Sequence, residues 1–273
     1  MKKWIIVIVL LIVIISIGTK AYYDTNVFKV NRVLFTSDKL PENAELTVLQ
    51  ISDLHSKVFG DDNKKLVKTV EESDADIIVI TGDLIDRRTN SLKAVFSLID
   101  RLININEHIY FVSGNHEWDN PSKEELLSGL AERNVTLLNN ENTQIHVNDI
   151  TLNVVGVDDV STEHEDMDKA FDSVGKEGYT ILLSHSPNVV EKYTNIPADL
   201  ILSGHTHGGQ VRLPWIGAII APDQGLFPKL DKGTFDIGKD QYLYLDSGLG
   251  TSMAPIRFLN QSQMSLIKIT GRK

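Results

Sequence analysis

The sequence predicts an α/β protein with a layered sheet core, preceded by one N-terminal transmembrane helix. Short apolar runs alternate with amphipathic segments, several of these runs end in histidine or aspartate, and the first residues have a composition of their own. The 273 residues are 42% hydrophobic and 23% charged, which suits a globular protein with a substantial core. Because no repeat or linker follows, we expect a signal-anchor segment over 1–23 and one domain over 24–273.

The N-terminal segment has the pattern of a signal anchor. Lys2 and Lys3 precede an apolar run from Trp4 to Gly18, and Lys20 follows it. The run is slightly short for a hydrocarbon core of about 30 Å, but lysine side chains at both ends extend its reach. We expect a single-pass helix in the cell membrane, with the rest of the chain outside the cytoplasm. The alternative is cleavage near Ala21, which would release a secreted protein.

The rest of the chain alternates between strand-like and helix-like segments. Amphipathic periodicity predicts helices over 61–73 and 91–103, and the residues from Ser122 to Glu125 predict a capping box at the start of a third helix. Segment 144–159 resembles a hairpin that turns at Asn148 and Asp149. Apolar runs rich in valine, isoleucine and leucine predict buried strands in the segments 46–55, 76–83, 109–116, 179–187, 198–207, 241–248 and 264–270.

Polar side chains follow five of these expected strands, where each strand ends. The residues are Asp53, His55, Asp83, Asn115, His116, His185, His205 and His207. In α/β sheets ligands bind at the carboxyl ends of strands, so we expect these side chains to meet. A spacing of two residues in an extended segment would put the first two on one side, and likewise the last two. Glycines before Asp83 and Asn115 would let the backbone turn sharply there.

This group of side chains predicts a metal site. Carboxylate oxygen and imidazole nitrogen suit a divalent transition ion such as Mn²⁺, Fe or Zn²⁺. The chain has no cysteine, which excludes thiolate ligands. More ligands are present than one ion requires, so we expect two divalent metal ions that share one carboxylate. Such a pair suits the in-line displacement of a phosphoryl group.

The motifs "DLH", "GDLIDR", "GNHE", "SH" and "GHTHGG" resemble those of the calcineurin-like metallophosphoesterase family over residues 46 to 250, in particular its bacterial membrane-anchored or exported members. The resemblance implies a four-layer α/β/β/α sandwich of two mixed sheets. It also implies a role for each residue. The first metal would be held by Asp53, His55 and His207, the second by Asn115, His185 and His205, and Asp83 would bridge them. His116 would be catalytic and Asp86 would orient it.

The expected reaction is hydrolysis of a phosphoester or pyrophosphate bond. Two cations lower the pKa of a water shared between them, and the resulting hydroxide would attack phosphorus while His116 assists the leaving group. Arg87 or Arg88 would hold a phosphate oxygen, although a solvated surface position suits either arginine as well. We expect Glu117 and the pair Asp158-Asp159 to cap backbone groups rather than to react.

The sequence leaves the substrate and the surroundings of the site open. A phosphorylated small molecule or a lipid-linked compound would suit the chemistry. The alternatives are an envelope-attached metal-binding module with little turnover, or a metal-dependent nuclease. The net charge of −10 disfavours nucleic acid. Segment 211–230 is apolar and rich in glycine and proline, so it either folds onto the sheet edge or forms an apolar lip that meets lipid.

Overall fold

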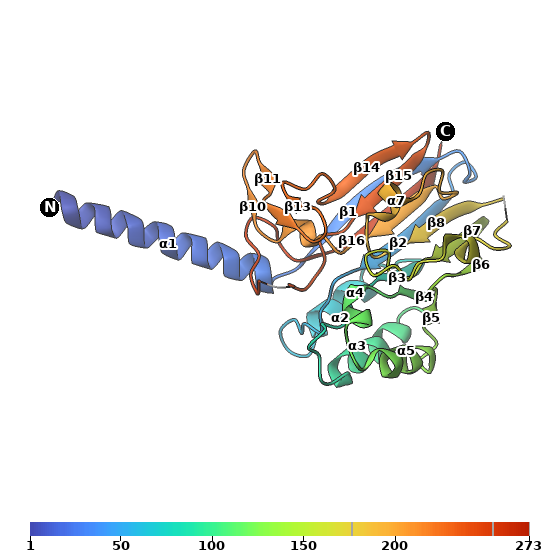
Figure 1. Cartoon of the computed structure of the whole chain (residues 1–273), viewed down its shortest axis with the longest axis horizontal. Coiled ribbons are helices and arrows are strands. Elements are labelled where there is room, and N and C mark those ends of the chain that lie inside the picture. Colours follow the sequence, from blue (N-terminus) through green and yellow to red (C-terminus); the bar gives the residue numbers. More distant parts are fainter. Residues whose placement is uncertain (176, 253, 273) are drawn as a thin grey trace.

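The computed structural model describes residues 1–175, 177–252 and 254–272 (Figure 1). The first helix, α1 (Lys2–Asn26), projects from one end of the domain that contains every other element (Figure 1). It is long and apolar enough to cross a membrane, and among the described residues it is the only helix with that property. A signal sequence near an N-terminus would have the same length and composition.

One mixed sheet contains the first strands of the domain and the last one. In spatial order its strands are β1 (Lys29–Ser37), β16 (Gln263–Gly271), β2 (Glu45–Ile51), β3 (Ile77–Thr81), β4 (Ile109–Val112) and β5 (Thr136–Leu137). Strands β2 to β5 are parallel, whereas β16 runs antiparallel to β2 and parallel to β1. The C-terminal strand therefore closes the sheet between two N-terminal strands.

The second mixed sheet contains the strands from the later part of the chain. In spatial order they are β14 (Gly233–Gly238), β15 (Gln241–Leu245), β9 (Leu200–Ser203), β8 (Tyr179–Leu183), β7 (Ile150–Gly156) and β6 (Glu141–Val147). The four inner strands are parallel, and each outer strand is antiparallel to its neighbour. Val147 pairs with Ile150, which places the β6–β7 turn at Asn148 and Asp149 as predicted.

The domain has four layers, namely helices, the two sheets and further helices, and an apolar cluster fills each of the three spaces between them. The helices α2 (Lys64–Glu71), α3 (Lys93–Ile103) and α5 (Lys123–Ala131) pack on the outer face of the first sheet. A second cluster fills the space between the sheets, and a third lies under α6 (Met167–Ala170) and α7 (Val189–Lys192) on the outer face of the second sheet. The predicted α/β class with two mixed sheets and an N-terminal apolar helix is confirmed.

The carboxyl ends of the parallel strands in the two sheets meet. The buried side chain of Gln50, near the end of β2, donates hydrogen bonds to Thr81 Oγ1 at the end of β3 and to the carbonyl of Ser203 at the end of β9, at 2.9 and 3.0 Å. Beyond these strands, the backbone nitrogen of Asp53 donates to the carbonyl of Gly82 at 3.1 Å. The loops that follow β2, β3 and β9 are therefore held against one another.

Three features of the sequence led to incomplete or wrong expectations. Strands β1 and β14 were not expected, because each lies at a sheet edge and lacks a clear apolar period. Segment 211–230 contains two short hairpins, which pair β10 (Arg212–Leu213) with β11 (Gly217–Ala218) and β12 (Ile220–Ala221) with β13 (Gly225–Leu226). At α5 the expected capping box is absent, since the Ser122 side chain caps nothing.

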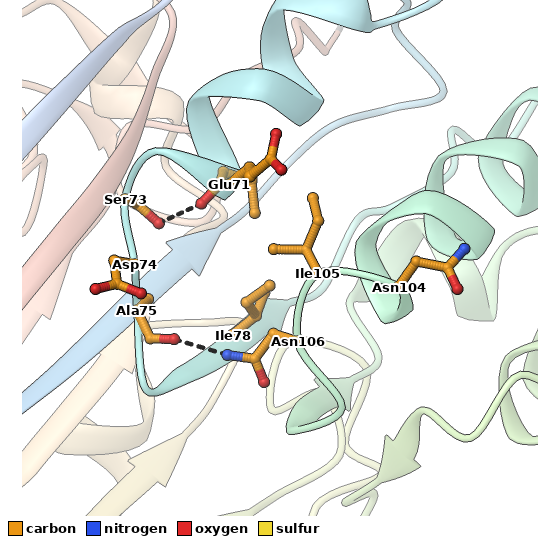
Figure 2. Close-up of a pocket in the computed structure, with 9 residues that line it drawn as sticks. Glu71, Ser73, Asp74, Ala75, Ile78, Asn104, Ile105 and Asn106 are labelled. Carbon is orange, nitrogen blue, oxygen red and sulfur yellow. Dashed lines mark hydrogen bonds between the residues drawn. The ribbon is translucent and has the colours of Figure 1, made fainter.

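A cavity of about 270 Å³ lies at the amino end of β3 (Figure 2). Its walls come from the turn after α2, where Ser73 lies, and from the end of α3. Asn106 closes one side by donating a hydrogen bond to the carbonyl of Ala75 at 2.7 Å. Ile78 in its lining is the second residue of β3, whereas Asp83 follows the other end of that strand. The cavity is therefore at the opposite end of β3 from the metal-type side chains.

Candidate metal centre

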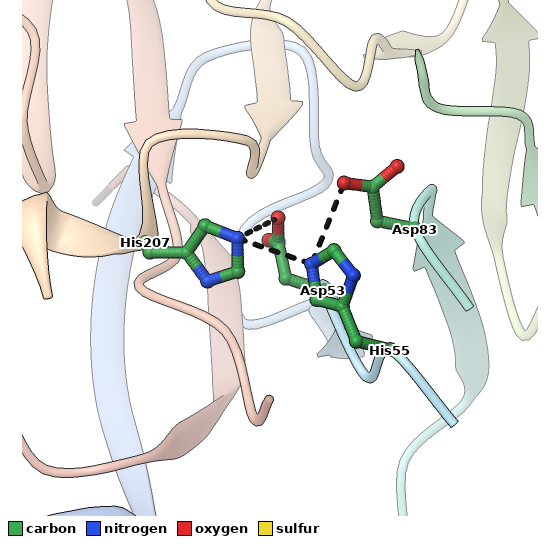
Figure 3. A group of neighbouring side chains, drawn as sticks. All are labelled: Asp53, His55, Asp83 and His207. Atoms are coloured by element: carbon green, nitrogen blue, oxygen red, sulfur yellow. Dashed lines mark hydrogen bonds and ion pairs between the residues drawn. The ribbon is translucent and has the colours of Figure 1, made fainter. Parts of the chain in front are cut away.

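Four of the expected ligands gather in one buried cluster, shown in Figure 3. Asp53, His55, Asp83 and His207 each offer a ligand atom, and these atoms all lie within 4.8 Å of one another. His55 Nε2 is 3.1 Å from His207 Nε2 and 3.5 Å from Asp83 Oδ2. His207 Nε2 is 3.5 Å from Asp53 Oδ1. Segments that follow β2, β3 and β9 thus supply one compact set of oxygen and nitrogen atoms.

The other three expected ligands form a second set beside the first. His205 Nδ1 lies 3.1 Å from Asn115 Oδ1 and 3.2 Å from His185 Nε2. His185 Nε2 is also 3.3 Å from Asn115 Oδ1. His185 and His205 are buried and Asn115 is half-buried. These residues follow β4, β8 and β9, so the second set joins the two sheets.

Asp83 lies between the two sets. Its Oδ2 is 3.5 Å from His55 Nε2 on one side and 3.3 Å from His185 Nε2 on the other. Its other oxygen, Oδ1, accepts a hydrogen bond from the backbone nitrogen of His116 at 2.9 Å, which fixes the carboxylate. A single oxygen atom therefore faces both groups of imidazole nitrogens.

The donor atoms fit metal ions. Pairs of imidazole nitrogens face each other at 3.1 and 3.2 Å, and such pairs need a shared proton or a cation between them. Two ligand atoms bound to one ion at about 2.1 Å, with an angle of about 90° between them, lie about 3 Å apart. The nitrogen and oxygen donors, without sulfur, match divalent Mn, Fe or Zn.

The backbone reaches this arrangement through left-handed turns. Asp53 and His55 both have φ near 50°, and His205 and His207 have φ of 70° and 51°. The expectation of extended segments was therefore wrong, because these residues lie beyond the strands, in turns that L-residues seldom adopt. Several strained residues in one place are typical of functional sites.

The glycines beside the ligands are required mainly for close approach. A Cβ atom at Gly82 would lie 2.5 Å from His185 Nδ1, and the φ of this glycine is +80°. Gly114 is extended, so it makes no sharp turn, contrary to expectation. A Cβ there would collide with the carboxylate of Asp83. Both glycines let the loops after β3 and β4 pack directly against ligand side chains.

Two ligand histidines are oriented by a hydrogen bond from the ring nitrogen that faces away from the cluster. His185 Nδ1 donates to the carbonyl of Thr81 at 2.8 Å, which leaves Nε2 free to bind a metal. His205 Nε2 donates to Asp223 Oδ2 at 2.7 Å, which leaves Nδ1 free. Such partners fix the tautomer and ring orientation of metal-binding histidines. The sequence did not indicate Asp223, because it lies in a hairpin turn whose two-residue strands carry no sequence motif.

A fully buried arginine lies behind His207. Arg257 Nη1 donates to the carbonyl of His207 at 3.3 Å, its Nε donates to Gly250 at 2.9 Å, and its Nη2 donates to Ser247. Its Nη2 is also 3.4 Å from His207 Nδ1. Burial lowers the pKa of Arg257 to about 10, so the guanidinium keeps its charge at pH 7. No pattern in the sequence indicated this residue.

The carboxyl groups that were expected to cap backbone groups do so. Glu117 is fully buried and accepts hydrogen bonds from the backbone nitrogens of Asp83, Ile85 and Gly114 at 2.9, 3.1 and 2.7 Å. It therefore holds the loop after β3 against the short helix α4 (Asn115–Trp118). Asp158 accepts from the ring nitrogen of Trp118 at 2.7 Å and from the backbone of Asp159.

His116 is buried beside His55, with the two ring centroids 4.4 Å apart. Its Nε2 is 4.0 Å from Asp83 Oδ2, and its Nδ1 is 3.4 Å from Asp86 Oδ2 and 3.1 Å from the backbone nitrogen of Arg87. The Arg87 side chain is half-exposed, and its Nη2 lies 3.3 Å from His116 Nε2. Arg88 instead pairs with Asp86 and is 75% exposed. Of the two arginines, only Arg87 therefore reaches the cluster.

Burial and the charges of facing side chains together set the pKa values in the cluster. Burial lowers the pKa of His55 to about 3 and also lowers the pKa of His207 well below its ordinary value, so both rings are neutral at pH 7. Burial would raise the pKa of Asp83, but facing His185 holds it well below its usual range. Burial raises the pKa of Asp53 to about 6. The neutral rings of His55 and His207 are in the state in which imidazole binds a cation. Burial alone would lower the pKa of His185, but the contact with Asp83 raises that pKa well above its ordinary value, so a metal ion at His185 would displace its proton.

Comparisons with known proteins agree with this arrangement. A family model described as calcineurin-like phosphoesterase matches residues 46–209. The chain is 29% identical over 257 residues to the Bacillus subtilis (strain 168) protein named uncharacterized metallophosphoesterase YkoQ, and the match covers 92% of this chain and 93% of that protein. It is 28% identical to an Aquifex aeolicus (strain VF5) protein named uncharacterized metallophosphoesterase, with 94% and 98% covered.

Solved structures show the same fold at low sequence identity. The match to the crystal structure of TT1561 from Thermus thermophilus covers 76% of this chain and 91% of the other, with 14% identity and a TM-score of 0.51. The family match spans more than half of the 273 residues and contains all seven expected metal ligands. Because the relatives are similar along nearly their whole length as well, the chain belongs to the calcineurin-like phosphoesterase family and is a phosphoesterase.

Proposed function

We propose that the protein hydrolyses phosphoester or pyrophosphate bonds with two divalent metal ions. The observation that carries this proposal is the position of Asp83 Oδ2, 3.5 Å from His55 Nε2 and 3.3 Å from His185 Nε2. One carboxylate oxygen between two sets of imidazole ligands suits a shared ligand for two ions. The first ion would be held with Asp53, His55 and His207, and the second with Asn115, His185 and His205.

The residues around the proposed metals divide the remaining work. When bound, the ions supply positive charge for phosphoryl oxygens and activate water for attack. His116 would donate a proton to the leaving oxygen from Nε2, since Nδ1 accepts a hydrogen bond from the backbone nitrogen of Arg87 and lies 3.4 Å from Asp86 Oδ2. Asp86 would position the ring. The Arg87 guanidinium would hold a phosphate oxygen, because its half-exposed position lets it contact a substrate that enters from solvent.

The substrate would be a phosphorylated small molecule or a lipid-linked compound that approaches at the membrane surface. We propose that α1 spans the cell membrane and that the domain lies on the extracytoplasmic side, as Lys2 and Lys3 at the helix start favour. Cleavage of α1 as a signal peptide would instead give a secreted enzyme. Ala21, at the expected cleavage point, is buried in the folded protein, which supports an uncleaved helix.

Two variants test the proposed roles. Full-length protein loaded with Mn²⁺ is assayed on p-nitrophenyl phosphate and on its bis ester. Asp83→Ala should lose nearly all activity, and Asp83→Asn controls for the hydrogen bond that Oδ1 accepts from the backbone nitrogen of His116.

His116→Ala should keep bound metal and lose rate. Loss of metal from His116→Ala would contradict its catalytic role, and failure of the metal-loaded wild type on both esters would favour a binding module.

A further inference from the structure

Several apolar side chains of the two hairpins in segment 211–230 are exposed to solvent. Trp215 is fully exposed, and four more apolar side chains are more than half exposed, namely Ile216, Ile220, Leu226 and Phe227. We call these five residues the hairpin surface. Apolar side chains in contact with water have a free-energy cost, and several of them in one segment usually mark a site of contact with a partner protein or a membrane.

The hairpin surface lies next to the base of α1. In β10, the backbone nitrogen of Arg212 donates to the carbonyl of Phe258 at 3.0 Å, and Phe258 in turn donates to Gln210 at 3.1 Å. The preceding residue, Arg257, donates its backbone nitrogen to Thr25 Oγ1 in the last turn of α1 at 2.8 Å. One short segment therefore joins the hairpins to α1, and Figure 1 shows both at the same end of the domain.

The base of α1 is packed into the domain rather than tethered by a loose linker. Asp24 is fully buried and Thr25 is 9% exposed, whereas the apolar residues from Trp4 to Ile17 are exposed. The backbone nitrogen of Ser262 donates to the carbonyl of Asp24 at 2.8 Å, and its hydroxyl donates to the carbonyl of Thr25 at 3.1 Å. The direction of α1 is therefore fixed relative to the hairpins.

We propose that the hairpin surface inserts into the interfacial layer of the phospholipid bilayer that α1 crosses. A helix that leaves the domain at this end brings the bilayer to the same end. Tryptophan and phenylalanine are well suited to the interface between headgroups and acyl chains. The inference depends on α1 being membrane-spanning, which is part of the proposed function, but it does not depend on hydrolytic activity.

Insertion would place the metal centre close to the membrane surface. Asp223, in the turn between β12 and β13, accepts the hydrogen bond from His205. The same hairpin therefore carries apolar groups toward the bilayer and a carboxylate toward an expected metal ligand. A phosphate group attached to a lipid would reach the centre without leaving the interface.

Single-site fluorescence tests this proposal on the full chain. The protein has no cysteine, so Trp215→Cys, Phe227→Cys and Asn148→Cys each carry one environment-sensitive dye. Asn148 is the matched control, because its exposed turn lies at the amino ends of the parallel strands, away from the hairpins. Each labelled protein is reconstituted into vesicles of phosphatidylethanolamine and phosphatidylglycerol, with and without lipids that carry nitroxide quenchers.

The proposal predicts blue-shifted emission at positions 215 and 227, with several-fold stronger quenching by the nitroxide lipids than at position 148. Equal quenching at all three positions, or protein that does not float with vesicles, would overturn it. A blue shift without lipid quenching would also overturn it, because it would indicate cover by protein. Hydrolysis of the bis ester by the same samples reports the proposed activity separately.

Discussion

Asp223 is the residue whose role the structure adds most directly to the metal centre. Its Oδ2 accepts a hydrogen bond from His205 Nε2 at 2.7 Å. This bond holds Nδ1 of the same ring toward Asn115 and His185. Hydrogen bonding to the side chain of His205 lowers the pKa of Asp223, so the carboxylate is ionised at neutral pH. A carboxylate behind a metal-binding histidine also increases the basicity of the ligand.

Replacing Asp223 should weaken metal binding without removing a ligand. We expect Asp223→Ala to lower the affinity for Mn²⁺ by about 10- to 100-fold, the usual effect of losing such a partner. Asp223→Asn keeps an oxygen acceptor and should lose less. Calorimetric titration of metal-free protein with Mn²⁺ measures both. An unchanged affinity in Asp223→Ala would show that the hydrogen bond does not orient His205.

The expected ligands could be predicted from sequence because each follows an apolar strand, and together they combine the histidine, aspartate and asparagine side chains that bind divalent transition ions. The residues behind them could not. Asp223 and Arg257 are ordinary surface-type residues in segments without a sequence motif, and only tertiary folding brings them to His205 and His207. Backbone conformation at Asp53 was also not predictable, since left-handed φ in a non-glycine residue has no reliable sequence signal.

Among the structural elements, the contact between α1 and the domain has the clearest energetic consequence. Thr25 Oγ1 accepts a hydrogen bond from the backbone nitrogen of Arg257, and both residues are buried. Thr25→Val preserves the shape of the side chain but leaves this donor without a partner, which costs about 1–3 kcal/mol. Thr25→Ser keeps the hydroxyl and is the control. Chemical denaturation in detergent micelles measures the difference, and equal stability of the two variants would contradict the packed junction.

Arg257 connects the loops that follow β9 and β15. We expect Arg257→Lys to be strongly destabilising, because a lysine cannot donate to the carbonyls of Gly250, Ser247 and His207 together. Each buried carbonyl left without a donor costs about 1–3 kcal/mol. Arg32→Lys, at an exposed position, is the control and should change little. Stability within error of wild type for Arg257→Lys would show that other donors replace the guanidinium.

Elements with strong periodicity were predictable, and those without it were not. The buried strands β3 and β8 and the helix α3 lie where their apolar patterns indicated. The edge strands β1 and β14 have one neighbour each, so burial imposes a weaker pattern on their sequences. In the hairpins of segment 211–230, two-residue strands are too short for any period to be visible.

For the molecule as a whole, the metal centre should couple folding to ion binding. The ligands come from loops after strands of both sheets, so bound ions hold the two halves of the sandwich together. At a Mn²⁺ concentration about 100 times the dissociation constant, each site should stabilise the fold by about 2.7 kcal/mol. Thermal unfolding with Mn²⁺ and with a chelator measures this. An identical midpoint in both would indicate that no ion is bound in the native state.

The central claim is that Asp83 is shared by two metal ions. Elemental analysis of the purified, Mn²⁺-reconstituted protein, combined with the same analysis of Asp83→Ala, tests it most directly. We predict two ions per chain in the wild type and nearly none in the variant. A wild type that saturates at one ion or none, or a variant that retains two, would contradict the claim.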